Sequence, residues 1–509
     1  MLRRRSTRIP NADDQPVKAA VMAVVDVIVP ASRPRLWQRV LVERLRACGH
    51  DVAVLHQSAD PWPAAALQIL RFERRLFRRR AVGLATPVEA ITQVQTQRPA
   101  DLRLDLTGVA PPSPAPTVRL TFDGRFSDFA AVSAVAAGRL PDLQAVLADG
   151  TVVGRAAPMI DKREATALGI EDVLARAVTL ALSVVARFDG GWADERQKIA
   201  PATGGAGGSG FVGRYVTSAL PRLGREALRR ARFRHAHWRV GYRFIDGPGV
   251  AETGMLGDGW RQLPDDGTHF YADPFPYAWR QGEHLIFVED YPHATGKAII
   301  SLVRIGADGA VRGPVEPVLE EPFHLSYPQV FDWQGDVWML PEGSASGRLT
   351  LYRAARFPDR WVAEAVLLEG KISDATLFQQ DGSWWLFATD RDGYGSTSDT
   401  MVVFRAPSPA GPWRPHRMNP IVIDRAMARP GGAFATVDGR PLLPVQDGTE
   451  GYGGGLGLSE LLELDENTVR LAPPRPVSGR GDWPYPRIHT LNRAGRLEVI
   501  DGIAAVRRR

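Results

Sequence analysis

The feature of this sequence that most constrains its fold is a short pattern that occurs five times in the C-terminal half. The first copy reads F-Y-A-D-P-F at Phe270–Phe275, and the others begin at Leu325, Ile372, Ala428 and Tyr485. Short strands that repeat at intervals of roughly 50 to 60 residues are typical of propeller blades. The pattern therefore predicts a propeller of five blades.

Each copy is followed by a dipeptide that ends in glycine and then by a second strand-like run, which is a strong hairpin signal. A further strand-like run, Trp238–Phe244, precedes the first copy. We predict that it joins the last blade and closes the ring, because closure removes an exposed sheet edge. The turn glycines are Gly282, Gly335, Gly382, Gly439 and Gly495.

Composition bounds the rest of the chain. With 509 residues it is too long for one ordinary domain. The single cysteine, Cys48, excludes an intrachain disulfide and favours a reducing compartment. The N-terminus shows no secretory signal, and the first apolar run, Ala19–Val29, is too short to span a bilayer. We therefore expect a cytoplasmic protein without a transmembrane segment.

The N-terminal third predicts an α/β domain over residues 19–188, after a disordered tail over residues 1–18. A strand at Val21–Val29, a helix at Arg33–Cys48 and a strand at Asp51–Leu55 would open a parallel sheet, because short joins link them. Further strands are expected at Leu102–Leu106 and Val118–Phe122, and a long helix at Glu164–Phe188.

Residues 189–236 are predicted to form a Gly-rich and basic helical linker. Glycines 208, 210 and 213 have the spacing of a dinucleotide-binding loop, but no strand precedes them, so no cofactor is expected. The basic helix at Tyr215–His237 is expected to pack on the propeller, and peripheral contact with an anionic membrane is the alternative. Basic and aromatic residues do not alternate as base stacking requires, so no nucleic-acid partner is expected.

In a propeller over residues 237–509, the starts of the first strands and the ends of the second strands meet on one face. This geometry predicts a funnel ringed by acidic side chains, with His324 near the funnel. First-strand starts supply Asp273, Tyr327, Asp374, Arg429 and His489. Second-strand ends supply Glu289, Asp290, Glu342, Asp390, Gln446, Asp447 and Asp501.

Clustered carboxylates raise one another's pKa values, which prepares them for acid–base work on a glycosyl bond. Asp273 and Asp374 occupy equivalent repeat positions, which favours a functional role for both. Arg429 can hold an anionic group or lower the pKa of a neighbouring carboxylate. Asp447 lies next to a glycine, so turn formation is its alternative role. The sequence has no Cys/His metal spacing, and we assign no metal site. A cation held by the carboxylate ring through oxygen ligands is the open alternative.

The N-terminal domain resembles the formyltransferases in its strand order and in the run D-L-R-L-D-L-T-G at Asp101–Gly108. The resemblance implies a Rossmann-like fold. Formyl transfer in that family uses an Asn, a His and an Asp, yet no Asn occurs between Ala12 and Ala200, and no His between Gln57 and Ala200. We therefore expect a non-catalytic domain for scaffolding or recognition.

The run Y-A-D-P-F resembles the first-blade motif of the arabinanase, levansucrase and invertase group of five-bladed propellers, in which the Asp is base or nucleophile. Phe270–Gly502 resembles more closely the N-terminal region of plant glucosamine inositolphosphorylceramide transferases. The matching runs are H-L-S-Y-P-Q-V-F, L-P-E-G, L-Y-R-A, G-P-W-R-P-H-R-M-N-P, A-R-P-G-G and I-H-T-L-N. The resemblance implies that the plant proteins carry their transferase activity in a further C-terminal domain. We do not expect this chain to have that domain or its activity.

The hydrolase group uses an Asp base in blade one, an Asp modulator in blade two and a Glu acid in blade three. Here blade two offers Tyr327 and blade three offers Asp374, so the resemblance implies a base at Asp273 and leaves the acid open. Glu342, at the end of a second strand, is the alternative acid. This departure weakens the case for hydrolysis and strengthens the case for binding alone.

Three hypotheses for function follow. In the first, a glycoside hydrolase-like propeller acts on a carbohydrate or glycosylated small molecule, with Asp273 as base or nucleophile, Asp374 as pKa modulator and Glu342 or Asp374 as acid. In the second, the funnel recognises a glycan or sugar-nucleotide without catalysis, in polysaccharide or glycolipid assembly. In the third, the propeller is a protein-interaction scaffold. Substrate contacts are predicted for Tyr327, Arg429, His489, His324, Asp447 and Glu289.

Overall fold

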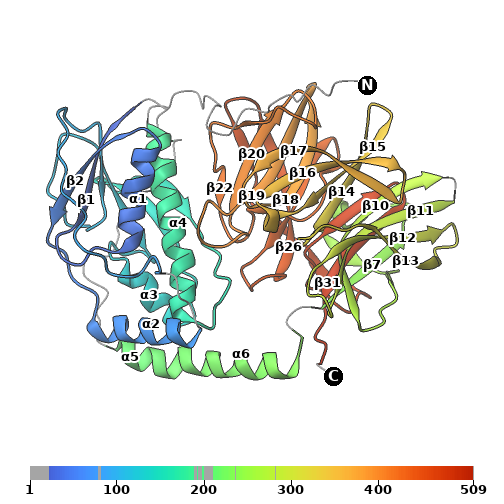
Figure 1. The fold of residues 1–509 in the computed structure, drawn as a ribbon, viewed down its shortest axis with the longest axis horizontal. Coiled ribbons are helices and arrows are strands. Elements are labelled where there is room, and N and C mark those ends of the chain that lie inside the picture. The colour runs from blue at the N-terminus through green and yellow to red at the C-terminus, as the bar shows by residue number, and fades with distance from the viewer. Residues whose placement is uncertain are drawn as a thin grey trace, which may run out of the picture.

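The computed structural model describes residues 22–77, 82–188, 192, 198–199, 210–234, 237–280 and 282–507. An α/β domain and a β-propeller lie side by side, and a helix runs along the lower edge of the molecule (Figure 1). The predicted tail and most of the Gly-rich stretch fall outside the described residues. Among the described helices, none combines the length and the apolar character needed to cross a bilayer.

The α/β domain is built on a mixed sheet of six strands. Its first four strands pair in parallel, and the last two pair antiparallel at one edge. An α/β domain is therefore confirmed, while the antiparallel edge was not predicted. In spatial order the strands are β2 (Asp51–Gln57), β1 (Val24–Pro30), β3 (Leu102–Asp105), β4 (Thr117–Phe122), β5 (Leu143–Leu147) and β6 (Val152–Ala156).

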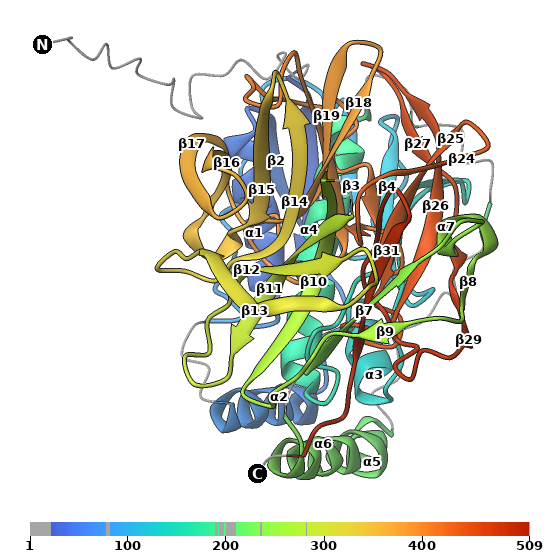
Figure 2. The ribbon, with the colours of Figure 1, turned by 90° about the vertical axis from the view of Figure 1, so that its right-hand side faces the viewer.

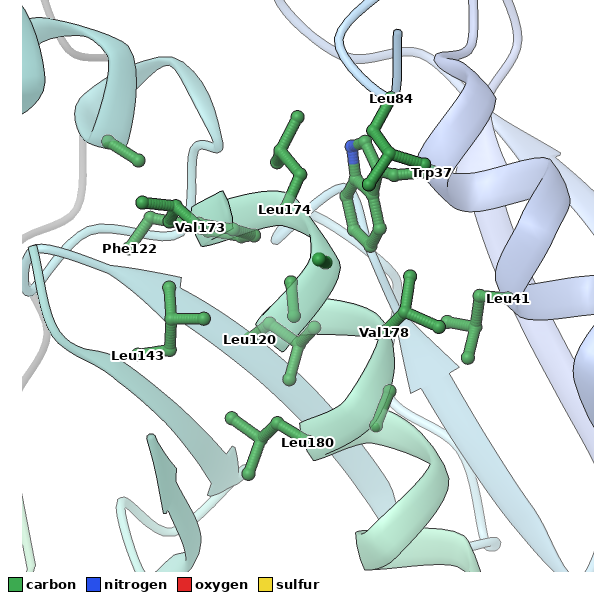
Figure 3. Close-up of a cluster of buried hydrophobic side chains, with 14 of the residues drawn as sticks. Trp37, Leu41, Leu84, Leu120, Phe122, Leu143, Val173, Leu174, Val178 and Leu180 are labelled. Atoms are coloured by element: carbon green, nitrogen blue, oxygen red, sulfur yellow. The ribbon is translucent and has the colours of Figure 1, made fainter. Parts of the chain in front are cut away.

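Apolar side chains from the sheet and from two helices form the core of this domain. Trp37 and Leu41 of α1 (Leu36–Ala47) lie close to Val178 of α4 (Thr166–Ala186) and to Leu120 of β4 (Figure 3). Helix α4 is apolar on nearly all sides, so it is buried between the sheet and the propeller (Figure 1). The other helices are α2 (Ala64–Leu76) and α3 (Phe129–Ala136).

The C-terminal region forms five antiparallel blades, as the repeats predict. Figure 2 shows the blades arranged around a common axis. Blade one comprises β10 (His269–Arg280), β11 (Glu283–Pro292), β12 (Ile299–Gly306) and β13 (Val311–Leu319). Blade two comprises β14 (Ser326–Trp333), β15 (Asp336–Glu342), β16 (Arg348–Arg356) and β17 (Arg360–Glu369). Blade three comprises β18 (Ile372–Gln380), β19 (Ser383–Asp390), β20 (Thr400–Ala406), β21 (Arg414–Pro415) and β22 (Val422–Ile423).

The ring is closed by strands from both ends of the propeller. β7 (Trp238–Phe244) pairs antiparallel with β31 (Leu497–Ile503), so the predicted closure is confirmed. The rest of blade five is β30 (Leu491–Ala494) and β9 (Arg261–Gln262). Blade four comprises β23 (Arg429–Pro430), β24 (Ala435–Val437), β25 (Arg440–Asp447), β26 (Gly455–Leu464), β27 (Val469–Leu471) and β28 (Arg475–Pro476). A separate ribbon pairs β8 (Met255–Gly257), which follows α7 (Val250–Thr253), with β29 (Ser478–Gly481).

A buried ion pair connects the α/β domain to the propeller. Arg176 of α4 is fully buried and lies 2.8 Å from Asp399, which is also fully buried in the loop between β19 and β20. The Arg176 guanidinium also donates to the carbonyl oxygens of Arg391, Tyr394 and Ser396. This side chain therefore holds most of the 391–399 loop.

Further contacts extend the interface to blade four and to α1. Arg44 of α1 pairs with Asp392 at 2.5 Å, and Arg425 pairs with Asp142 at 2.7 Å. Asp390, which the sequence places among the funnel acids, instead lines a cavity of about 460 Å³ beside Arg44. The two domains therefore meet over the blade three and blade four loops.

The basic helix packs on the α/β domain, so its predicted packing on the propeller is wrong. It is continuous through α5 (Phe211–Arg214), the π-helical turn η3 (Tyr215–Ala219) and α6 (Leu220–Arg232). Phe211 enters the core of the α/β domain, and Tyr215 donates to the buried Glu73 of α2 at 2.6 Å. An aromatic anchor thus decides which domain holds the helix, and Figure 1 shows it running below that domain.

Candidate functional site

Three equivalent blade positions share an uncommon backbone conformation. Asp273, Tyr327 and Asp374 have φ of 47°, 47° and 48°, the left-handed region that non-glycine residues seldom occupy. Each lies at an irregularity in the register between the first and second strands of its blade. Such bulges aim a side chain differently from the regular pleat, and retained backbone strain of this kind clusters at functional sites.

Asp273 belongs to a buried cluster on the blade five side of the axis. His489 lies between two carboxyl groups, with Nε2 3.3 Å from Asp273 Oδ1 and Nδ1 2.7 Å from Asp501 Oδ2. The approach of His489 does not make a hydrogen bond to Asp273 Oδ1, and this buried oxygen has none among the described residues. Asp501 also accepts from the backbone N–H of Asp273 and of His489. The cluster thus contains a buried Asp273 carboxyl group with an oxygen that accepts no hydrogen bond from a described residue, beside the hydrogen-bonded Asp501.

Asp374 belongs to a second cluster whose hydrogen bonds are nearly complete. Arg429 donates to both of its carboxylate oxygens, at 2.6 and 3.2 Å, and Gln446 donates at 2.5 Å. Arg429 also lies 3.5 Å from Glu342 Oε2, which accepts from the backbone N–H of Asp374. Ser344 donates to the other oxygen of Glu342. The Asp374 carboxylate is therefore fixed by its neighbours, with little left for a ligand.

Burial and charge push the pKa values of these carboxyl groups apart. Burial and the charge of Asp374 raise the pKa of Glu342 to about 8, so it holds a proton at neutral pH. Burial also favours the neutral form of Asp374, but the charge of Arg429 and the hydrogen bonds from Glu342 and Arg429 lower its pKa. Burial, followed by the charges of Glu289, Asp374 and Asp501, raises the pKa of Asp273 well above its usual range. Because these carboxyl groups change one another's pKa values, the protonation of each one depends on the charges of the others.

Tyr327 occupies the blade two position that is equivalent to Asp273 and Asp374. It is fully buried, and its hydroxyl accepts from the Gly432 backbone at 2.6 Å and lies 2.8 Å from the Thr376 hydroxyl. The tyrosine therefore cross-links blades two, three and four at the axis.

His324 and Asp447, two of the other predicted contact residues, make separate contacts. His324 is 3.3 Å from Glu289, and although burial lowers the pKa of His324, the hydrogen bond and charge of Glu289 raise it overall. Asp447 accepts from the backbone N–H of Thr449 at 2.8 Å, so one of its oxygens serves the turn. His324 is thus linked through Glu289 to the charges around Asp273, whereas the side chain of Asp447 serves its own turn.

Two aromatic residues of the site were not identified from the sequence. Trp238 stacks on His489 with ring centroids 3.8 Å apart, and Tyr452 approaches the same ring edge-on at 5.7 Å. Tyr452 also lies within 5.7 Å of the Arg429 guanidinium, and it is 45% exposed. Neither residue belongs to a repeated position, so the repeat pattern carried no signal for them.

One group of ligand atoms has the spacing of a cation site. Asp273, His489 and Asp501 each offer a ligand atom, and these atoms lie within 4.8 Å of one another. The set mixes two carboxylates and an imidazole, which suits a divalent cation. The same atoms can equally share protons among themselves, so their spacing alone does not select a metal.

The loop that contains Ser398 and Asp399 connects the α/β domain to this site. Ser398, next to the buried Asp399, accepts a hydrogen bond from Arg429 at 3.0 Å. Because Arg176 holds Asp399, the domain interface and the Asp374–Arg429 pair share one rigid segment. The α/β domain therefore sits on the loops that border the funnel at blades three and four.

A family model described as glucosamine inositolphosphorylceramide transferase 1, N-terminal, matches residues 263–505. A protein of that name from Oryza sativa subsp. indica is 35% identical over 249 residues, which cover 46% of this chain and 33% of the relative. Its namesake from Arabidopsis thaliana is 34% identical over 207 residues, covering 40% of this chain and 27% of the relative. The resemblance expected from the sequence is confirmed for the propeller, and the chain spans about a third of the length of these relatives.

Solved structures also resemble the propeller region at low identity. An endo-1,4-β-xylanase from Bacteroides thetaiotaomicron is 13% identical, with a TM-score of 0.35, over 48% of this chain and 94% of that one. An exo-β-1,3-galactanase from Clostridium thermocellum is 12% identical, with a TM-score of 0.34, over 47% and 60% of the two chains.

Proposed function

We propose that the propeller funnel binds a carbohydrate and acts on its glycosyl bond, with Glu342 as general acid and Asp273 as base or nucleophile. The observation that carries the proposal is that the same cluster of charges holds Glu342, a buried carboxyl group whose pKa is raised to about 8, and Asp273, a buried carboxyl group with an unused oxygen. Cleavage of a glycosyl bond needs a proton donor for the leaving oxygen and a carboxylate on the other side of the bond.

Asp374 is best suited to modulate the acid. Its negative charge raises the pKa of Glu342, and its own oxygens already accept from Arg429 and Gln446. A carboxylate so fully engaged is a poor nucleophile, because attack would break charge-assisted hydrogen bonds. The contacts therefore support a modulating role and favour Glu342 over Asp374 as the acid.

Asp273 must lose its proton before it can act as base or nucleophile. His489 lies close enough to take that proton, and the nearby Asp501 would stabilise the resulting imidazolium. Arg429 also lowers the pKa of Asp273 in part. These contacts support ionisation of Asp273 once a ligand enters the funnel.

The name of the plant relatives, glucosamine inositolphosphorylceramide transferase, supports a sugar-containing ligand for this propeller. For the α/β domain we propose a formyltransferase-like fold used as a scaffold. Its parallel strands support the fold, and the missing Asn and His over that region argue against formyl transfer.

Recognition without catalysis is the second candidate. Tyr327 occupies a repeat position at which blades one and three carry an Asp, and its hydroxyl is committed to contacts between blades. The raised pKa of Asp273 also favours a neutral carboxyl group that hydrogen-bonds a sugar hydroxyl. Both features would suit a binding site.

A panel of aryl glycosides tests the proposal, with binding measured in parallel by calorimetry. Turnover by the wild type should fall about 10²-fold or more in Asp273→Asn, because a group of this kind contributes at least that much. Asp438→Asn is the matched control, since Asp438 lies in an outer hairpin turn of blade four. Binding without turnover by the wild type would support recognition, and neither binding nor turnover would refute both candidates.

A further inference from the structure

The face formed by α2 and the α5–α6 helix exposes an unusual number of large apolar side chains. Both helices lie along the same lower edge in the two views (Figures 1 and 2), and Tyr215 ties them together through Glu73. We call their outward-facing side chains the basal face. Its exposed apolar residues, each between 41% and 60% exposed, are Phe72, Leu76, Val212, Val216, Leu220 and Leu228.

The spacing of these residues places them on the flanks of two helices. Val212, Val216 and Leu220 follow one another at intervals of four residues, so they form a stripe. Phe72 and Leu76 have the same spacing on α2. No residue of α6 is buried, so its leucines gain little from the fold described. Exposed apolar stripes of this kind mark a surface that meets a partner.

The charge of the basal face indicates the chemistry of that partner. Residues 211–232 contain six arginines and one glutamate, a net charge of +5, and α2 contains three arginines and one glutamate, a net charge of +2. Arg71, Arg75, Arg225 and Arg232 form no ion pair with another described residue. Arginines beside an exposed apolar stripe are the signature of a helix that lies in the interface of an anionic bilayer.

We propose that the basal face binds the surface of an anionic lipid bilayer. The apolar stripe would enter the boundary between headgroups and acyl chains, while the arginines contact anionic headgroups. Glu226 pairs with Arg229 and Arg230, so the exposed Arg225 and Arg232 keep positive charge that Glu226 does not neutralise. The proposal is independent of the funnel chemistry.

Co-sedimentation of the full chain with vesicles tests this proposal. The wild type should bind vesicles of phosphatidylcholine with about a third phosphatidylserine, and bind phosphatidylcholine vesicles far more weakly. Binding should weaken as salt rises from about 0.1 to 0.5 M, because screening shortens the reach of the arginines. Equal binding to both vesicle types, or no binding to either, would overturn the proposal.

Two pairs of substitutions separate lipid binding from damage to the fold. Val216→Asp with Leu220→Asp should reduce binding at least about tenfold, since both apolar groups would become charged. Val362→Asp with Val366→Asp is the matched control, because these side chains are 39% and 37% exposed on the propeller strand β17. Unchanged binding in the first pair, or equal loss in the control, contradicts the proposal.

Charge reversal and solution size complete the test. Arg225→Glu with Arg232→Glu should weaken binding to anionic vesicles about tenfold or more, because each arginine near such a surface contributes to attraction. Light scattering after gel filtration tests whether a second copy of the chain, and not a bilayer, covers the basal face. A dimer that dissociates in the Val216→Asp, Leu220→Asp variant would show that the face binds a second copy of the chain and would overturn the lipid assignment.

Discussion

Removal of the Arg176 guanidinium should destabilise the protein more than any exposed arginine substitution. Arg176→Met deletes the ion pair with Asp399 and four further hydrogen bonds, to Thr179 and to the three carbonyl oxygens of the 391–399 loop. Asp399 would keep the N–H of Met159 as a donor but would lose its buried counter-charge. Breaking a buried pair by removing one partner costs about 3–5 kcal/mol.

The assay is the thermal midpoint followed by circular dichroism, with limited proteolysis of the 391–399 loop as a second readout. Arg353→Met is the control, because Arg353 pairs with Glu364 at 3.2 Å with both side chains more than a third exposed. Its removal should change stability by no more than about 1 kcal/mol. Arg176→Met with Asp399→Leu should recover much of the loss, since it removes the unpaired charge as well.

The reasoning is refuted if Arg176→Met lowers the midpoint no more than Arg353→Met does. A double variant that is less stable than Arg176→Met alone would also contradict it, because the unpaired Asp399 would then not be the main cost.

Three further predictions concern the site. The folded-state pKa of Glu342 is raised to about 8, so the folded state holds this proton more tightly than the unfolded chain, and wild-type stability should fall as pH rises from about 4.5 through 8. Glu342→Gln should flatten that decline in thermal midpoints, and an identical slope would contradict it. Asp374→Asn removes a charge that raises the pKa of Glu342, so the alkaline limb of any pH–activity profile should move to lower pH; an unmoved limb argues against coupling. Gly432→Ala should lower the stability of the protein by roughly 1–3 kcal/mol, because φ is 146° and a Cβ would meet the Leu491 carbonyl oxygen. Gly439→Ala is the control, because a Cβ there would enter open space, and it should lower the thermal midpoint less.

The propeller could be predicted because its signals are local and repeated. Dipeptides such as Asp381-Gly382 and Asp438-Gly439 adopt positive φ at both residues, which is what a tight hairpin turn requires. Equivalent positions in equivalent blades then point to one axis, so the meeting of Asp273, Asp374 and Arg429 followed from the repeat alone. The need to cover an exposed sheet edge likewise predicts that the strand Trp238–Phe244 joins the last blade, where it pairs with β31.

The remainder depends on contacts between residues far apart in the sequence. Arg176 lies in an almost wholly apolar helix, and its partner Asp399 is 223 residues away. The basic helix shows the same limit, since Phe211 and Tyr215 choose the domain on which it packs. Local sequence patterns do not show whether such a helix packs on the α/β domain or on the propeller.

The saturation of Asp374 was also beyond sequence reasoning. Its repeat position equals that of Asp273, yet Arg429 and Gln446 converge on one of the two acids only. The difference arises from blade four, whose first strand departs from the pattern at Arg429–Pro430. Equivalent positions therefore predicted proximity but not the separate chemical roles.

The most direct measurement of the central claim is how Glu342→Gln responds to the leaving group across a series of aryl and alkyl glycosides. A general acid is needed most when the leaving oxygen is basic, so kcat/KM should fall about 10²–10⁴-fold for alkyl glycosides and much less for nitrophenyl glycosides. The same loss for every leaving group, or no loss at all, would contradict the assignment of Glu342 as the proton donor of the funnel.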